Sequence, residues 1–158
     1  MSGSGSMRAG GDDAGLPPFE QTISAIMIEA KEAVIAPLRP TLRDHDITEP
    51  QWRVLRVVRD RAPTDATGIA EVCLLHAPSV TRILKDLERR GLVVRVLDAS
   101  DRRRTLISLS PAGRALVDEI SRTMVRLLRD YGDRFGADRL ERLGEELRAL
   151  SAAIKGLD

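Results

Sequence analysis

The chain has 158 residues, of which 42% are hydrophobic and 31% charged, and its formal net charge is +1. This length and composition fit one globular domain with its own core and exclude a disordered chain. The sequence has neither an apolar run of about 18 residues nor a signal-peptide pattern, so we expect a cytoplasmic protein without a membrane span.

The first 47 residues predict a disordered N-terminal segment followed by a helix. Residues 1–18 are rich in Gly, Ser and Asp and predict a disordered segment, of which the first six resemble a leader added for expression. Residues 19–47 predict a helix, because Ile23, Ile26 and Ala30 fall on one face. Pro37 and Pro40 are expected to kink or end it.

Residues 48–91 predict three further helices. Thr48 and Gln51 have the spacing of a capping box, which indicates the start of a helix. Thr67 is expected to cap a short second helix. Pro78 suits the first turn of a third helix, and Gly91 suits the left-handed position at its end.

The remaining sequence predicts a hairpin and two more helices. Two apolar strands, at residues 92–97 and 105–109, flank a charged loop. Ser110 is expected to cap a helix that runs to about Tyr131, and residues 132–137 to break it. Leucines three and four residues apart then mark a final helix. The whole order predicts a mainly α-helical fold with a small β-hairpin wing, and a winged helix-turn-helix at residues 48–110.

The third of these helices has two opposed faces. Val80, Ile83, Leu84 and Leu87 form an apolar stripe that would anchor it to its own domain. Residues 78–104 carry eight Lys or Arg against four Asp or Glu, whereas residues 7–50 carry four against eight. This basic region predicts a DNA-reading surface. Its expected DNA-binding residues are Ser79, Thr81, Arg82, Lys85 and Arg89 on the helix, and Arg102, Arg103 and Arg104 on the hairpin.

The stretch APSVTRILKDLERRGLVVRVLDASDRRRTLISLSPAG resembles the MarR family of winged-helix regulators. The family's helix pattern is met by Ser79, Thr81, Leu84, Leu87, Glu88, Gly91 and Leu92, with Thr81 displaced by one position. Its wing pattern is met by Asp98, Asp101, Arg102 and Arg103. The resemblance implies a homodimer on a pseudo-palindromic operator in double-stranded DNA. It also implies dimerisation helices at residues 19–47 and 111–158, and a wing that Asp101 orients through Arg103.

The stretches PLRPTLRDHDITEPQWRVLR and CLLHAPSVTRIL are more narrowly similar to the HpaR-like branch of that family. This resemblance implies a repressor of an aromatic-acid catabolic operon that a small aromatic carboxylate releases from DNA. The family resemblance implies an effector pocket between the dimerisation helices and the winged domain, where the expected effector-binding residues are Arg39, Arg43, His45, Trp52 and Met27. Their chemistry is compatible with such a ligand, because guanidinium groups can clamp a carboxylate and a ring can stack on an indole. The alternative is that Trp52 anchors the core and the arginines are solvated.

The sequence offers no catalytic or metal-binding constellation. Cys73 and His76 are spaced C-x-x-H, but His45 is the other histidine and no second cysteine exists, so we expect neither a metal site nor a cofactor. Cys73 is expected to be a core thiol. An enzyme is therefore disfavoured. The remaining alternative, a winged-helix protein-interaction module without effector, is less consistent with three arginines at the tip of the wing.

The last predicted helix points to self-association. Leu140, Leu143, Leu147, Leu150 and Ile154 form a stripe at heptad-like spacing. A terminal helix must bury such a stripe, either against its own chain or against a second copy. Together with the helix in residues 19–47, this stripe is expected to build a dimer interface.

Overall fold

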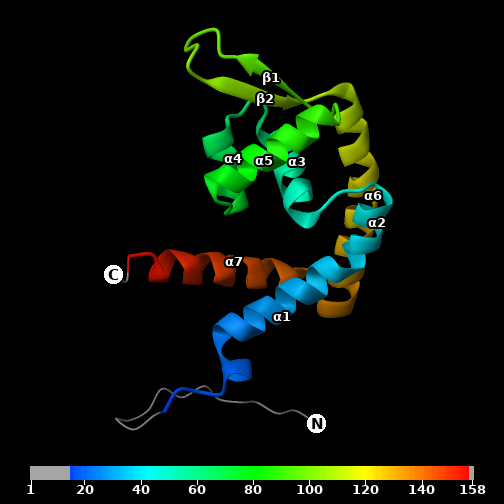
Figure 1. Ribbon diagram of the computed structural model, residues 1–158. Coiled ribbons are helices and arrows are strands. Elements are labelled where there is room, and N and C mark those ends of the chain that lie inside the picture. The colour runs from blue at the N-terminus through cyan, green and yellow to red at the C-terminus, as the bar shows by residue number, and fades with distance from the viewer. Residues whose placement is uncertain (1–14, 157–158) are drawn as a thin grey trace. The chain divides into compact units, whose positions relative to one another are not determined.

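The computed structural model describes residues 15–156 (Figure 1). The chain divides into two compact units, with the division between Pro37 and Leu38. The first unit holds α1 (Ile23–Ile35), preceded by a 3-10 helix at Phe19–Gln21. The hydroxyl of Thr22 caps α1 by accepting a hydrogen bond from the Ala25 backbone N–H at 3.2 Å. Residues 15–18 form neither helix nor strand, and residues 1–14, most of the predicted disordered segment, lie outside the described residues.

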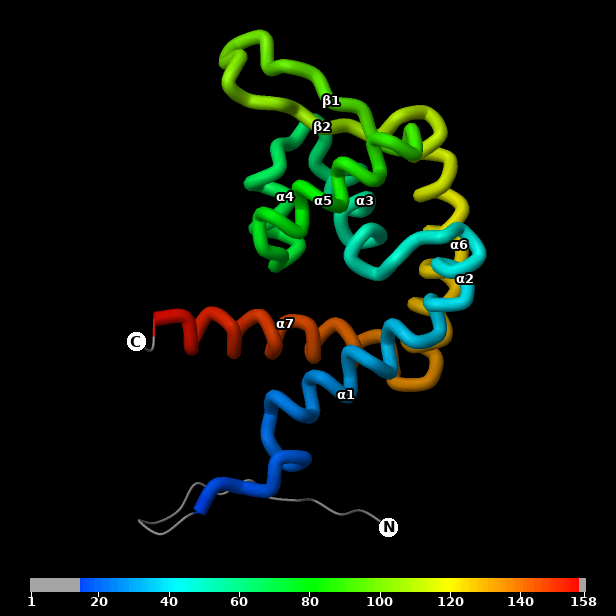
Figure 2. Tube along the Cα trace, in the orientation of Figure 1, coloured from blue at the N-terminus to red at the C-terminus, as the bar shows by residue number. Residues whose placement is uncertain are grey.

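The second unit is a winged helix-turn-helix followed by two long helices. Its elements are α2 (Arg39–Asp44), α3 (Glu49–Arg61), α4 (Ala66–Cys73), α5 (Ala77–Arg89), β1 (Val93–Leu97), β2 (Thr105–Leu109), α6 (Pro111–Phe135) and α7 (Ala137–Ile154). The strands pair antiparallel, and an isolated bridge joins Thr64 to Ile107. Figure 2 traces α3, α4 and α5 gathered against this hairpin, whose tip projects beyond them. This architecture confirms the predicted fold class.

Local capping signals explain where several elements begin and end. Thr48 and Gln51 form the predicted capping box of α3. Gly91 has φ 68°, a left-handed conformation that glycine adopts without steric cost, and it follows the C-cap of α5. The Ser110 hydroxyl accepts a hydrogen bond from the Gly113 backbone N–H at 2.9 Å and so caps α6. These residues behave as the sequence predicts because each signal acts within four positions.

Two element boundaries differ from the prediction. Asp65, not Thr67, caps α4: its carboxylate accepts from the Gly68 backbone N–H at 2.9 Å, which leaves Thr67 inside the first turn. The helix α6 runs through Gly132 and ends at Gly136, which has φ 97°. A glycine inside a helix costs only about 1 kcal/mol, so Gly132 does not end α6, whereas the positive φ at residue 136 requires a glycine.

The segment with two prolines agrees with the expectation that they kink or end the first helix, because a second helix starts within it. After α1, a 3-10 turn at Ala36–Leu38 leads into the separate short helix α2. Pro40 lies in the first turn of α2, where its missing N–H leaves no helical hydrogen bond unmade. The prolines therefore end one helix and start the next.

The core of the second unit lies between α2, α3, α4, α5, the hairpin and the first half of α6. The predicted inward face of α5 is buried, with Val80, Leu84 and Leu87 fully inaccessible. Cys73 is also buried, and burial raises the pKa of its thiol. In contrast, neither α1 nor α7 contains a buried residue, and the side chains of the α7 stripe are 36–53% exposed from Leu143 onward. The fold thus anchors α5 firmly and leaves the apolar stripes of α1 and α7 open.

Candidate nucleic-acid interface and effector site

The outward face of α5 carries the side chains predicted to read DNA. Arg82 and Lys85 are exposed, and neither forms a hydrogen bond or ion pair within residues 15–156. The Thr81 hydroxyl donates to the Ala77 carbonyl at 3.0 Å, and Ser79 is half-buried at the start of the helix. Arg89 differs from Arg82, because its guanidinium is paired with Asp86 one turn earlier at 2.5 Å. The unpaired cations Arg82 and Lys85 therefore lie in the middle of α5, on the outward face that a recognition helix presents to DNA.

The hairpin tip holds two exposed arginines. The side chain of Arg103 is 93% exposed, and Asp101 accepts from its backbone N–H at 3.0 Å and from its Nε at 3.3 Å. An exposed pair of this kind adds about 0–1 kcal/mol to stability, so its main effect is on the direction of the side chain. Arg102 is exposed and has no polar partner in the described part of the chain.

The third arginine of the wing is held by the helix-turn-helix. The Arg104 guanidinium donates to Asp65 Oδ2 at 2.5 Å, while Oδ1 of the same carboxylate caps α4. The hydrogen bond from Gly68, and then that from Arg104, lowers the pKa of Asp65 below its ordinary value. Arg104 thus ties the base of the wing to the start of α4, which distinguishes it from Arg102 and Arg103.

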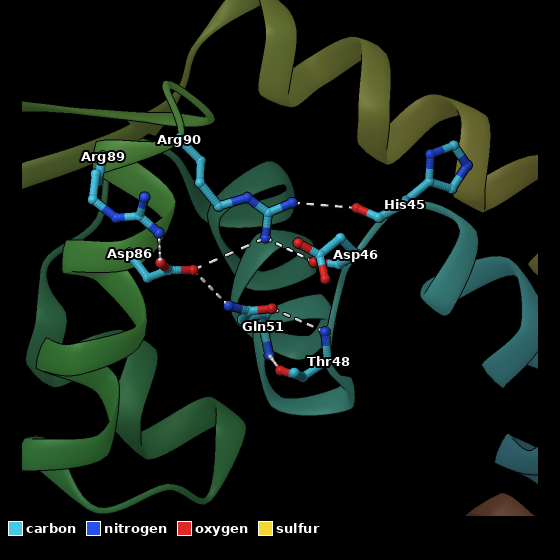
Figure 3. A network of polar contacts seen from close by, with 7 residues as sticks. All are labelled: His45, Asp46, Thr48, Gln51, Asp86, Arg89 and Arg90. Atoms are coloured by element: carbon cyan, nitrogen blue, oxygen red, sulfur yellow. Dashed lines mark hydrogen bonds and ion pairs between the residues drawn. The ribbon is translucent and has the colours of Figure 1, made fainter.

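A polar network joins the end of α5 to the chain that precedes α3 (Figure 3). Arg90 Nη1 donates to the Asp46 carbonyl at 2.8 Å, and Nη2 donates to the His45 carbonyl at 3.2 Å. Asp86 accepts from the Gln51 side-chain amide at 2.9 Å. Gln51 also completes the capping box of α3, so the same side chain contacts both helices. Sequence reasoning missed Arg90 and Asp86, because partners 35 to 45 positions away leave no local signal.

The predicted effector residues lie on different elements and have different polar partners. Arg39 forms an ion pair with Glu49 at 2.6 Å, and Arg43 is exposed. His45 Nε2 lies 3.6 Å from a carboxylate oxygen of Glu119 on α6. Met27 is an exposed residue of α1, in the first unit.

Trp52 occupies the core position that the sequence left open as an alternative. Trp52 is only 4% exposed, and the Arg56 guanidinium lies 5.7 Å from the centroid of the indole ring. Arg56 Nη2 is 3.7 Å from Asp60, but the buried Nε has no hydrogen-bond partner within residues 15–156. Arg56 follows Trp52 by four positions on one helix, so their spacing could have marked Arg56 from the sequence.

The described residues include no helix long and apolar enough to cross a membrane.

Comparisons with known proteins agree with the geometry of α5 and the wing. Residues 45–104 match the MarR family. The homoprotocatechuate degradative operon repressor of Escherichia coli is 30% identical over 125 residues, covering 79% of this chain and 84% of that protein.

Two solved structures resemble the chain over most of its length. NadR in complex with 4-hydroxyphenylacetate superimposes with a TM-score of 0.77 at 29% identity, covering 87% of this chain and 97% of NadR. BpsR of Bordetella bronchiseptica, whose DNA binding is regulated by 6-hydroxynicotinic acid, gives 0.74 at 25% identity, covering 87% and 98%.

Proposed function

The chain belongs to the MarR family of transcription regulators, and on that premise we propose that it represses an operon as a homodimer on a pseudo-palindromic operator. The observation that supports this most directly is the pair of unpartnered cations, Arg82 and Lys85, on the open face of a helix whose other face is buried. Residues 48–110 would bind DNA, and residues 19–47 and 111–158 would hold the dimer. Such a regulator works beside the chromosome, in the cytoplasm.

Each recognition helix α5 would enter the major groove. Arg82 and Lys85 would donate to base edges or phosphates there, with Ser79 and Thr81 near the bases and Arg89 at the periphery. Arg102 and Arg103 would enter the adjacent minor groove, where the negative potential is strongest. Asp101 would keep Arg103 pointed along the wing, and Arg104 would hold the wing on α4.

Operator binding tests this proposal. Selection from random duplexes should yield a pseudo-palindrome with half-site centres about 10 bp apart. The variant R82A/K85A should bind it at least about tenfold more weakly and with a shallower salt dependence, because it has lost phosphate or base contacts. R126A removes an exposed arginine of α6, far along the chain from α5, and should stay within about twofold. Unchanged binding by R82A/R103A would contradict the proposal.

The effector is proposed to be a small aromatic carboxylate of the phenolic or pyridine type, and the operon one for aromatic or heteroaromatic acid catabolism. Support comes from the ligands of NadR and BpsR and from the operon that the E. coli repressor controls. Arg56 adds a physical argument, because a ligand carboxylate would supply an acceptor for its unsatisfied Nε and an aromatic ring could pack near Trp52.

The remaining predicted effector residues stay in the proposal. Arg39, Arg43 and His45 would contribute from the short stretch before α3, and Met27 from α1. Release follows if the ligand binds the DNA-free arrangement of the two recognition helices more tightly than the bound one. A hundredfold preference corresponds to about 2.7 kcal/mol.

Measuring how each variant releases the operator when ligand is added tests which of these residues bind the effector. Operator release by 4-hydroxyphenylacetate and by 6-hydroxynicotinate should be lost in R56Q, while its operator affinity without ligand stays within about threefold. R61Q removes an exposed arginine at the end of the same helix and should respond as the unmodified protein does. The site would be wrong if R39A, R43A, R56Q and W52F all released DNA at the unmodified protein's ligand concentration.

A further inference from the structure

The chain between α2 and α3, residues 45–48, presents carbonyl groups that the backbone itself cannot satisfy. Asp46 has φ 54°, and the N–H groups of Asp46 and Ile47 bond back to Arg43 and Leu42 at 2.9 and 2.8 Å. This Schellman arrangement ends α2, and the His45 and Asp46 carbonyls accept hydrogen bonds from a side chain instead. A cation there is favourable, because helix C-terminal carbonyls carry partial negative charge.

Arg90 supplies that cation from the far end of the recognition helix. Its side chain is only 22% exposed, and it holds both carbonyls while lying 3.9 Å from Asp86. Asp86 in turn accepts from Gln51, which caps the first turn of α3. Two contacts on successive turns of α5 therefore fix its last turns against residues 45–51, as Figure 3 shows.

The same short segment borders the residues of the proposed effector site. Glu49, which pairs with Arg39, opens α3, and Trp52 directly follows Gln51. A ligand that binds these side chains would therefore contact the first turn of α3 or the loop before it, and could displace either. The network would pass such a movement directly to α5.

We infer that Arg90 and Asp86 are positioning residues, which set the orientation of α5 through residues 45–51 and couple effector binding to DNA release. Neither residue touches DNA in this scheme. The inference that these residues couple effector binding to DNA release rests on the proposed function. The inference that they orient α5 depends only on operator binding.

The test compares R90Q with R95Q. Each variant removes one guanidinium next to α5. Arg90 directly follows α5 and contacts the loop before α3, whereas Arg95 lies on β1 and pairs with Glu88 of α5 at 3.0 Å. Operator affinity is measured over a range of salt concentrations, with and without 4-hydroxyphenylacetate or 6-hydroxynicotinate. Calorimetry on the DNA-free protein gives the ligand affinity. D86N, which keeps the shape of Asp86 but removes its charge, serves as the second variant if R90Q does not fold. It is compared with the unmodified residue in an R89Q background, because Asp86 also pairs with Arg89.

R90Q should bind the operator about tenfold more weakly with the salt slope unchanged, because no phosphate contact is lost. Its ligand affinity should stay within about twofold, while the ligand-induced change in operator affinity falls at least about fivefold. R95Q should keep both quantities. The inference is overturned if R90Q behaves like R95Q, or if its salt slope drops by about 0.9, which would make Arg90 a phosphate contact. If the unmodified protein responds to neither ligand, the effector proposal fails, and the salt-dependent affinity of R90Q still decides the positioning role.

Discussion

Arg104 and Asp65 show how one carboxylate can serve two elements. Asp65 caps α4 with one oxygen and holds the wing arginine with the other, across 39 positions of sequence. Arg104 could instead have been a third DNA contact, as its place beside Arg102 and Arg103 predicts. The two roles have opposite consequences when the charge of Asp65 is removed.

The variant D65N separates these roles, because asparagine still caps a helix but no longer pairs with a guanidinium. If Arg104 anchors the wing, D65N should weaken operator binding about threefold to tenfold without changing the salt slope. If Arg104 contacts phosphate, freeing it should leave binding equal or tighter. R104Q completes a double-mutant cycle, in which the anchor predicts that the two losses do not add.

The same residue predicts a dependence of stability on pH. The pKa of Asp65 is lower in the folded protein than its ordinary value of 3.8. Its carboxylate therefore stabilises the fold fully above the unfolded pKa, and this contribution is lost as the pH falls through the folded pKa. The free energies of unfolding of the unmodified protein and of D65N should differ at pH 6, and this difference should shrink as the pH falls below 3.8. A difference that persists in acid would point to lost packing instead of lost charge.

For the helices and strands, the sequence predicts features that depend on neighbouring residues, but not those that depend on contacts between distant segments. The capping box at Thr48 and the glycine at residue 91 could be predicted because their partners lie within one turn. The choice of Asp65 over Thr67, and of Gly136 over Gly132, depends on competing residues a few positions apart. Trp52 and Arg90 could not be assigned from periodicity, since their roles depend on elements brought together only by the fold.

The start of α6 shows a close approach that the sequence does not announce. Gly113 is buried in the first turn of α6, and a Cβ there would overlap the carbonyl oxygen of Leu92 and lie 2.8 Å from its carbon. The Leu92 carbonyl also accepts from Ser110, so it cannot turn away without breaking the cap region. The wing is thereby seated directly on α6.

G113A should consequently lower the free energy of unfolding by about 2–4 kcal/mol, because backbone must move to admit the methyl group. G144A is the matched control, since a Cβ at this position in α7 meets only the Arg148 guanidinium at 3.7 and 3.9 Å. That substitution should be neutral or stabilising by up to about 1 kcal/mol. Chemical denaturation measures both, and equal effects would refute the close approach at Gly113.

For the whole molecule, the distribution of apolar surface argues for a second copy of the chain. Ile23, Ile26 and Val34 of α1 are 46–49% exposed, and Leu143, Leu147 and Ile154 of α7 are 37–53% exposed. Burying one leucine side chain contributes about 1.5–3 kcal/mol, so stripes of this length are costly to leave in water. A symmetric pair would also supply the two recognition helices that a pseudo-palindrome requires.

The variant L147E places a charge in the α7 stripe, whereas A149E places the same charge on the opposite face of that helix. Light scattering at micromolar concentration should give twice the 17.4 kDa chain mass for the unmodified protein and A149E, and a smaller mass for L147E. L147E should bind the full operator at least about a hundredfold more weakly, because the second recognition helix no longer binds within the same complex. Its affinity for an isolated half-site should equal that of A149E, which shows that the DNA-binding unit itself is intact. A mass of 17.4 kDa for the unmodified protein would contradict the dimer.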